Sequence, residues 1–466
     1  MKSFAISTSL MPHQVDAVNK VLPSRIGALF MEQGTGKSLT AIELAQLRAG
    51  KIDRVVWFCP VSLKRTVRGE ILKHTDCTDA DICVFDDKIT ANTIPDAMWY
   101  VVGIESMSAS TRVVLTVQQL INDRTMVILD ESTYIKGHHA IRTRRITLFS
   151  QDARYRLAMT GTPLTQGVVD LFAQMRFLSP KILGYNSFYS FAANHLEYSD
   201  KFPGMIVRAH NTEYLAAKIK PYVYQVTKAE CLNLPQKLYD TKYFDLTDEQ
   251  RYEYERVKDV FLSLADAETF TNYAIFQLFT YLQQITSGFL NYGGRKEYRH
   301  RRLDTLMDAV EGVADSEKVI IWAKYRRDIE SVSQALKTAY GDDSVSMFYG
   351  NLSEKQRNAE VEKFRGRARF FVATQSTGGH GLTLNESNRV IFYNNGFKYS
   401  EREQAEDRCH RIGQQYNVTY TDVHCSHTID DRIWKALCNK GSVVADFRRE
   451  IERVKKNRMK ELIKAL

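Results

Sequence analysis

Short apolar runs alternate with helix-like segments in two separate series along this chain of 466 residues. Runs that are apolar on both faces are typical of strands buried in a parallel sheet, and the helical patterns between them supply the crossovers such a sheet requires. The first series comprises 26–31, 55–58, 99–102, 126–129 and 157–159, and the second comprises 319–322, 345–348, 370–374, 390–393 and 418–423. The sequence therefore predicts an α/β chain with two parallel-sheet domains in tandem.

Composition agrees with a folded chain of more than one domain. Hydrophobic residues make up 44% and charged residues 26%, which are ordinary values for globular proteins. The 7 cysteines include no Cys-x-x-Cys pair, which argues against a zinc module or a disulfide framework and favours a reducing compartment. No stretch approaches the roughly 18 uninterrupted apolar residues of a membrane span. We therefore expect a soluble intracellular protein.

The segment between the two series has a different character. It is rich in aromatic residues and helix-like patterns and lacks alternating strand patterns, and Thr247 and Gln250 have the spacing of a capping box at the start of a helix. Gly293 and Gly294 form the expected hinge. The predicted domains are a first sheet domain over 1–180, a helical spacer and hinge over 181–302, a second sheet domain over 303–440 and a basic C-terminal helix over 441–466.

The formal net charge of +9 is concentrated in two windows, 295–302 and 443–466. Clustered basic residues of this kind indicate local contacts with a polyanion rather than a uniformly basic surface. Two solvated basic faces are the alternative, and for the second window this alternative is equally good. Apolar residues there also recur near helical spacing, which implies packing of the tail on a neighbouring element.

The octapeptide at 31–38, Met-Glu-Gln-Gly-Thr-Gly-Lys-Ser, separates an apolar run from a helix-like stretch. Its glycines allow backbone N–H groups to turn toward the β- and γ-phosphates of a nucleotide, and the helix that follows points its positive end at them. Lys37 is then positioned to neutralise phosphate charge, and Ser38 to ligate Mg²⁺. Because Met31 stands where the full motif has glycine, an ordinary strand–helix turn is the alternative.

Asp130 and Glu131 follow directly on the apolar run at 126–129. Ligands of parallel sheets bind at the carboxyl ends of the strands, where these two acids are expected to lie. Asp130 is the candidate Mg²⁺ ligand opposite Ser38, and Glu131 is the candidate base that orients and deprotonates an attacking water. An exposed acidic turn would explain this segment alone, but together with Lys37 it indicates a nucleotide hydrolase.

Gln404, Arg408 and Arg411 are spaced i, i+4 and i+7, which predicts one face of a helix over 400–412. Two aligned guanidinium groups suit a phosphate, and an arginine supplied to a γ-phosphate from another domain stabilises transition-state charge. If the second sheet domain carries these arginines, hydrolysis depends on closure of the two domains. An exposed charged helix is the alternative.

Taken together, these motifs resemble those of the Swi/Snf-type ATPases of helicase superfamily two, and the resemblance runs nearly from end to end. Its most specific stretch is 404–414, Gln-Ala-Glu-Asp-Arg-Cys-His-Arg-Ile-Gly-Gln, which resembles motif VI. The other matching segments are 10–14 (the glutamine motif), 34–38 (motif I), 59–62 (motif Ia), 130–131 (motif II), 160–164 (motif III) and 377–382 (motif V).

The resemblance implies two RecA-like domains, ATP and Mg²⁺ as cofactors, and ATP-driven movement along double-stranded DNA. It implies a nucleotide site formed by Gln14, Gly34, Thr35, Gly36, Lys37, Ser38, Gly381 and Gln404, and catalytic roles for Lys37, Glu131, Arg408 and Arg411. Coupling of nucleotide state to DNA grip is implied for Thr160, Gly161 and Thr162. A protein that acts on DNA in this way is expected in the cytoplasm or associated with the nucleoid.

Duplex DNA is expected to be held through its phosphates by loop residues. The candidates are Ser62, Lys64, Ser106, Thr374 and Gly379. Hydroxyl and N–H groups of loops bind phosphate without reading bases, as a motor that works on any sequence requires. A solvated side chain is the alternative for Lys64.

One departure from the family pattern is notable, because Ser132-Thr133 follows the acidic pair where the family usually has Ala-His. The preferred interpretation is a minimal bacterial or viral double-stranded DNA translocase. The alternatives are a strand-separating DNA or RNA helicase and a nucleotide-gated DNA clamp without motor activity. An intact set of hydrolytic residues disfavours the clamp, since a clamp does not need a water-activating base.

Overall fold

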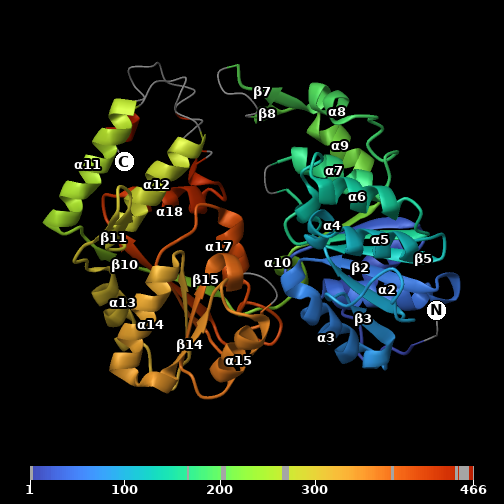
Figure 1. The fold of residues 1–466 in the computed structure, drawn as a ribbon, viewed down its shortest axis with the longest axis horizontal. Coiled ribbons are helices and arrows are strands. Elements are labelled where there is room, and N and C mark those ends of the chain that lie inside the picture. Colours follow the sequence, from blue (N-terminus) through green and yellow to red (C-terminus); the bar gives the residue numbers. More distant parts are fainter. Residues whose placement is uncertain are drawn as a thin grey trace. The chain divides into compact units, whose positions relative to one another are not determined.

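The computed structural model describes residues 4–164, 167–200, 206–264, 272–378, 382–444, 446, 450, 461–464 and 466. The chain divides into two compact units, Met1–Asn233 and Leu234–Leu466, and each contains one large sheet (Figure 1). The two units are described separately below.

The sheet of the first unit has seven strands in the order β3-β4-β2-β5-β6-β1-β9. Every neighbouring pair in it is parallel. The strands are β1 (Ile26–Met31), β2 (Arg54–Cys59), β3 (Ile82–Val84), β4 (Trp99–Gly103), β5 (Thr125–Asp130), β6 (Tyr155–Thr160) and β9 (Val223–Val226). The five predicted strands of the first series are confirmed. Their side chains are buried on both faces, as in β5, where only the last residue is partly exposed.

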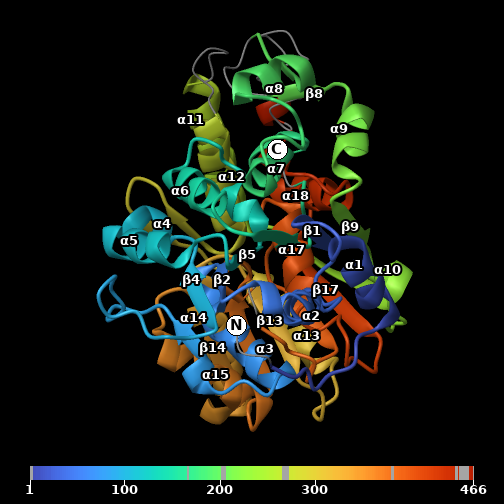
Figure 2. The same cartoon turned by 90° about the vertical axis from the view of Figure 1, so that its right-hand side faces the viewer.

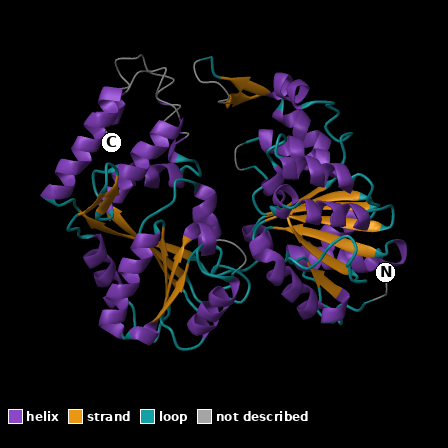
Figure 3. Ribbon diagram, in the orientation of Figure 1, coloured by secondary structure: helices purple, strands orange, loops and turns teal. Residues whose placement is uncertain are grey.

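Helices cover both faces of this sheet (Figures 2 and 3). One apolar core lies under α1 (Pro12–Val21), α2 (Lys37–Leu47) and α3 (Lys64–His74). The other lies under α5 (Thr111–Leu120), α6 (Ile141–Ser150) and α7 (Val169–Leu178), with the short α4 (Ser106–Ala109) beside them. Because all strands of this sheet are parallel, their carboxyl ends lie at one edge of the sheet, where ligands bind in doubly wound folds.

The sheet of the second unit has six strands in the order β10-β17-β16-β13-β15-β14, again all parallel. The strands are β10 (Lys237–Phe244), β13 (Val319–Ala323), β14 (Val345–Phe348), β15 (Phe370–Thr374), β16 (Arg389–Phe392) and β17 (Val418–Cys425). The helices are α13 (Arg302–Glu311), α14 (Arg326–Tyr340), α15 (Glu354–Arg365), α16 (Gln375–Gly378), α17 (Tyr399–Glu406) and α18 (Ile429–Cys438). The predicted second series is therefore confirmed as well, and the fold is α/β with two parallel-sheet domains.

The segment expected to be a helical spacer is more varied than its composition indicates. It contains α8 (Phe188–His195), α9 (Thr212–Ile219), α10 (Lys228–Cys231), α11 (Asp248–Leu264) and α12 (Asn272–Thr286), and the small antiparallel pairs β7 (Leu196–Tyr198) with β8 (Ile206–Ala209) and β11 (Phe289–Asn291) with β12 (Arg295–Glu297). It also supplies β9 to the first sheet and β10 to the second. The predicted cap of α11 is present, with Gln250 N donating to Thr247 Oγ1 at 3.3 Å.

The predicted hinge at Gly293 and Gly294 is wrong. These glycines, with φ of 65° and 117°, form the turn of the β11–β12 hairpin within the second unit, where a tight reversal requires positive φ. The boundary between the two units falls at Asn233 and Leu234 instead.

One member of the basic window at 295–302 is not available to a polyanion. The side chain of Arg302 is 0% exposed and forms a salt bridge with Asp430, while its Nη1 donates to Tyr393 O at 2.6 Å. Most of the predicted C-terminal helix lies outside the described residues. Within the described part of the chain, none of the helices is both long enough and apolar enough to cross a membrane.

Candidate functional site

The predicted phosphate loop connects β1 to α2 and depends on glycine at two positions. Gly34 and Gly36 have φ of 83° and 85°, a region that residues with a Cβ rarely adopt. A Cβ at Gly36 would also lie 2.0 Å from Gln14 Nε2. Helix α2 begins at the next residue, Lys37, so its first N–H groups point toward the loop.

Two side chains of α1, those of His13 and Gln14, form hydrogen bonds with the backbone of this loop. Gln14 Nε2 donates to Gly36 O at 3.1 Å, and Gln14 Oε1 accepts from Met11 N at 2.7 Å. A ring nitrogen of His13 bonds Thr35 O at 2.8 Å. Gln14 and Thr35 thus lie at the loop as predicted. His13 was not predicted, and its position next to Gln14 on the first buried turn of α1 is the signal that could have identified it.

Lys37 lies against the loop that precedes it. Its Nζ donates to Met31 O at 2.8 Å and to Glu32 O at 3.3 Å. Its positive charge opposes the burial and the Glu131 charge that raise the pKa of Asp130 at the end of β5, so the lysine and the acid face the same space. Ser38 follows in the first turn of α2. The predicted lysine, serine and aspartate therefore converge at the carboxyl ends of β1 and β5.

The surroundings of the Asp130 carboxyl group disfavour its charged form. Burial and then the like charge of Glu131 raise its pKa from 3.8 to about 6, against the opposing effect of Lys37. A carboxylate in such a place is stabilised by a nearby cation. Its oxygen and the Ser38 hydroxyl are the hard oxygen ligands Mg²⁺ prefers, and Mg²⁺ typically takes only one or two protein carboxylates together with phosphate oxygens and waters. The donor set therefore fits Mg²⁺, although no cluster of three or more metal-ligating side chains occurs among the described residues.

Glu131 adopts φ of 52°, in the left-handed region, directly after β5. Its Oε1 accepts hydrogen bonds from the hydroxyls of Thr133 and Thr160, both at 2.9 Å. Thr160 Oγ1 in turn accepts from Thr162 N at 3.2 Å. The candidate base is thus joined directly to the predicted coupling segment at the end of β6.

Gly161 brings that segment against the phosphate loop. A Cβ at Gly161 would lie 3.0 Å from Gln33 Cγ and 3.1 Å from Gln33 N. The close approach favours glycine, because a side chain here would force Gln33 to shift, and it places the coupling segment within van der Waals distance of the loop that would hold phosphates. The structure therefore brings all predicted nucleotide, metal and coupling residues of the first unit to one edge of its sheet.

Two of the predicted DNA contacts lie on neighbouring loops at the same edge. Ser62 is exposed in the turn after β2, and Ser106 begins α4 after β4. The loops are tied together because Glu105 Oε2 accepts from Val61 N at 2.9 Å. Lys64 differs from a freely solvated lysine, since its Nζ donates to Phe85 O at 2.6 Å.

In the second unit, the predicted helix over 400–412 is wrong, because α17 ends at Glu406. The chain then tightens into turns in which Arg408 N and Cys409 N bond carbonyls three residues earlier, and Gly413 takes φ of 100°. Gln404 lies on the helix, but Arg408 and Arg411 do not share a helical face with it.

The two arginines nevertheless converge. Arg408 Nη1 and Arg411 Nη1 donate to the same carbonyl, Leu382 O, at 3.2 and 3.3 Å. Arg408 Nε also donates to Gln404 O at 2.9 Å. Gln404, Arg408 and Arg411 are therefore brought together at Leu382, the end of the motif V segment. A turn after α17 does this, and not a continuous helix as predicted.

The remaining predicted residues of the second unit are at the end of β15 and beyond it. Thr374 is the last residue of β15, with a buried hydroxyl that has no hydrogen-bond partner among the described residues. Gly379 and Gly381 lie outside the described residues.

A network of charges beneath the arginine turn was not predicted. Arg402 donates to Glu406 Oε1 at 2.7 Å and to Asp422 Oδ1 at 2.6 Å, and Lys237 Nζ donates to Glu406 Oε2 at 2.9 Å. Burial alone would raise the pKa of Glu406, but the charges of Arg402 and Lys237 hold it below its usual value. The network joins α17 and β17 to β10, whose Lys237 is 169 residues from Glu406, so no local pattern could have revealed it.

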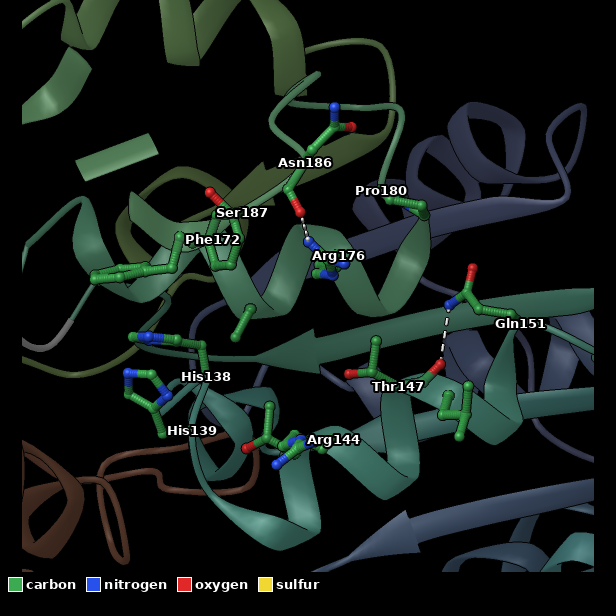
Figure 4. Close-up of a pocket in the computed structure, with 14 residues that line it drawn as sticks. His138, His139, Arg144, Thr147, Gln151, Phe172, Arg176, Pro180, Asn186 and Ser187 are labelled. Atoms are coloured by element: carbon green, nitrogen blue, oxygen red, sulfur yellow. Dashed lines mark hydrogen bonds between the residues drawn. The ribbon is translucent and has the colours of Figure 1, made fainter. Parts of the chain in front are cut away.

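A cavity of about 520 Å³ opens beside α6 and α7 in the first unit (Figure 4). His138 stacks on Phe188 there with ring centroids 3.6 Å apart, and burial lowers the pKa of His138 to about 4. None of the predicted site residues lines it. The lining residues are His138, His139, Thr143, Arg144, Thr147, Leu148, Gln151, Phe172, Ala173, Arg176, Pro180, Asn186, Ser187 and Phe188.

Comparison with protein families matches nearly the whole chain. The SNF2-related domain matches residues 18–293, and the helicase conserved C-terminal domain matches residues 301–413. The first match covers more than half of the chain.

Individual relatives are more distant. The chain is 26% identical over 326 residues to the uncharacterized ATP-dependent helicase MG018 of Mycoplasma genitalium, covering 68% of this chain and 30% of the relative. It is 27% identical over 324 residues to the putative ATP-dependent helicase/translocase YwqA of Bacillus subtilis, covering 66% of this chain and 34% of the relative. It is 25% identical over 454 residues to the human DNA annealing helicase and endonuclease ZRANB3, covering 94% of this chain and 40% of the relative.

This chain thus spans between 30% and 40% of the length of these relatives. Among solved structures, it is similar to the Sulfolobus solfataricus SWI2/SNF2 ATPase core in complex with dsDNA, with a TM-score of 0.44, 22% identity, and coverage of 100% of this chain and 96% of that one.

Proposed function

Because this chain belongs to the SNF2-related family, we propose that it is a DNA-dependent ATPase that uses ATP hydrolysis to move along double-stranded DNA. The observation that supports this proposal best is the convergence of Lys37, Asp130 and Glu131 at one sheet edge, with Glu131 bonded to Thr160 of the coupling segment. A protein that only binds the Mg²⁺ complex of a nucleotide can use the lysine and Asp130, but it does not need a second carboxylate placed to activate water.

In this proposal, the loop N–H groups and Lys37 bind the phosphates of ATP. Asp130 and Ser38 would hold Mg²⁺, which neutralises phosphate charge when bound. Glu131 orients the attacking water and accepts its proton. Arg408 and Arg411 are proposed to stabilise the charge that develops on the γ-phosphate, the role expected of such arginines.

Movement along DNA is proposed to follow from the bond between Glu131 and Thr160. Hydrolysis changes the charge next to Glu131, and the coupling segment at 160–162 is the nearest element that can respond to it. The candidate DNA contacts Ser62 and Ser106 lie at the same edge of the sheet, on loops joined through Glu105 and Val61. Double-stranded DNA is the proposed substrate, as in the family pattern that motif VI resembles.

The test is the ATPase rate measured with duplex DNA, single-stranded DNA and RNA, beside a Glu131→Gln variant. We expect stimulation by duplex DNA and a loss of turnover in the variant with retained binding of a fluorescent ATP analogue. Displacement of a triplex-forming strand then reports movement without requiring strand separation. Stimulation by RNA alone would refute the substrate, and unchanged turnover in the variant would refute the role of Glu131.

A further inference from the structure

We propose that Gln174, which lies in α7 outside every motif, is a positioning residue for hydrolysis that acts with Ser132 to lock the Glu131 turn to the coupling segment. The effect on turnover rests on the proposed ATPase function. The lock itself is a property of the folded chain and can be measured without nucleotide.

The contacts of Gln174 join three elements. Ser132 Oγ donates to Gln174 Oε1 at 2.6 Å, and Gln174 Nε2 donates to Pro163 O and to Asp170 O, both at 2.9 Å. Ser132 and Gln174 are both 0% exposed. The amide orientation is unambiguous, because carbonyl oxygens can only accept hydrogen bonds.

Packing alone does not explain an amide at this position. Apart from Gln174 and Asp170, the buried residues of helix α7 are apolar. An aliphatic side chain of similar size at position 174 would fill the same space without the cost of desolvating a polar group. The amide instead satisfies the buried hydroxyl of Ser132 on one side and the carbonyl of Pro163 on the other. It therefore sets the distance between the turn after β5 and the segment after β6.

That distance determines the position of the Glu131 carboxylate. Oε1 of Glu131 is shared by hydroxyls from both segments, Thr133 after β5 and Thr160 at the end of β6. If the two segments move apart, Glu131 Oε1 can keep at most one of these two hydrogen bonds. With Oε1 held by two donors, Oε2 is the oxygen that remains to contact the attacking water, so the lock selects which oxygen acts as the base.

The lock also accounts for the departure from the usual Ala-His in this family. Ser132 supplies the hydroxyl that reaches Gln174, and Thr133 supplies the hydroxyl that reaches Glu131. An alanine at the first position could make no bond to Gln174. The two residues that depart from the family pattern therefore act together with Gln174.

The first experiment compares Gln174→Met, Ser132→Ala and the double variant in steady-state ATPase assays with saturating duplex DNA. We expect each single change to lower kcat at least fivefold with KM for ATP within twofold of the parent value. The double variant should be no slower than Gln174→Met alone, since both changes break the same contact. A kcat within twofold of the parent for Gln174→Met, or additive losses in the double variant, would overturn the proposal.

Gln151→Met is the matched control, because Gln151 Nε2 also donates to two carbonyls, Thr147 O and Phe177 O at 3.1 Å, away from the site. Its kcat should stay within twofold of the parent. Thr133→Val should lower kcat at least tenfold, whereas Thr133→Ser, which keeps the hydroxyl, should recover to within threefold. An equal loss in the valine and serine variants would contradict an orienting role.

The second experiment is hydrogen exchange of the nucleotide-free protein. Gln174→Met and Ser132→Ala should speed exchange in peptides spanning 160–163, where Thr162 N–H bonds Thr160, and Gln151→Met should not. Unchanged exchange in both variants would overturn the lock even if turnover changed. If the parent protein hydrolyses no ATP, the proposed function fails, but this measurement still decides whether the lock exists.

Discussion

Replacing Asp130 with asparagine should abolish hydrolysis and at the same time stabilise the nucleotide-free protein. Burial and the neighbouring charge of Glu131 raise the pKa of Asp130 from 3.8 to about 6. The native state therefore binds this proton more tightly than the unfolded state does. Ionising the group destabilises the fold, and the amide of asparagine removes that charge while keeping nearly the same shape.

The size of the effect follows from the displacement of the pKa. One pKa unit corresponds to about 1.4 kcal/mol, so a displacement of roughly two units corresponds to about 3 kcal/mol at pH 8. Since the folded-state pKa is raised, the destabilisation is absent below about pH 4, grows through the interval up to about pH 6, and is complete above it. At pH 5 it should be about half of its value at pH 8. For a unit of this size, about 3 kcal/mol corresponds to a rise of roughly 6 to 12 °C in melting temperature.

The measurement is thermal unfolding of Asp130→Asn and the parent between pH 5 and pH 8, without nucleotide. Asp152→Asn, the same change at an exposed site, is the control and should alter stability by less than about 0.5 kcal/mol. A melting temperature of Asp130→Asn that is equal to or below that of the parent at pH 8 would refute the reasoning, as would a gain that does not shrink toward pH 5. In parallel, Mg²⁺-dependent ATPase activity should fall about a hundredfold or more, since several kcal/mol of charge stabilisation are lost.

Three further outcomes test other parts of the structure. Gly36→Ala should raise KM for ATP at least tenfold, because Gly36 has φ of 85° and the new Cβ would lie 2.0 Å from the side-chain amide of Gln14. The control Gly50→Ala, whose Cβ would meet no atom within 4 Å, should leave KM for ATP unchanged. Arg302→Met should destabilise the second unit by about 3 to 5 kcal/mol, since the carboxylate of Asp430 is left buried without its arginine partner. Denaturant titration beside the control Arg301→Met, a change at an exposed site, measures this, and equal stability of the two variants would count against it. Duplex binding should weaken with salt at a log–log slope of about −3.6 if about four phosphates are neutralised, and a slope near zero would contradict phosphate-based grip.

The central strands could be predicted from sequence because they are apolar on both faces. All five residues of β13 are buried, and a short apolar run of this kind, bounded by polar residues, is typical of a strand in the middle of a parallel sheet. The strands β9 and β10 could not be found this way. In β10, seven of the eight residues are partly or fully exposed and only the last, Phe244, is buried. Its partner in the sheet, β17, begins at Val418, far along the chain. Such a strand is defined by pairing with a distant segment, not by its own pattern.

In the candidate site, too, residues fixed by their neighbours in the sequence could be predicted, and residues placed by distant contacts could not. Local signals identified the phosphate loop and the acidic pair, since glycine and carboxylate positions are fixed by adjacent residues. The prediction that Arg408 and Arg411 share a helical face with Gln404 was wrong. The spacing i, i+4, i+7 is necessary for such a face, but it does not ensure that the helix continues. Gln174 left no local signal, since helix α7 also contains Asp170 and Arg176 and the partner of Gln174, Ser132, is 42 residues away.

The buried charges of the chain separate structural from functional roles on physical grounds. Arg302 and Arg402 in the second unit are almost wholly buried, but each faces a carboxylate, so their charges are compensated and their loss would chiefly affect folding. Asp130 instead lies beside a second acid, and Glu131 has backbone dihedrals that a residue with a Cβ adopts only at a cost. Each feature also occurs singly elsewhere, as at the buried Asp328, whose pKa is raised to about 7, and at Asn211, which has φ of 50°. At Asp130 and Glu131 the two features occupy consecutive positions beside a lysine and a glycine loop, the arrangement expected where a bound ligand supplies further positive charge.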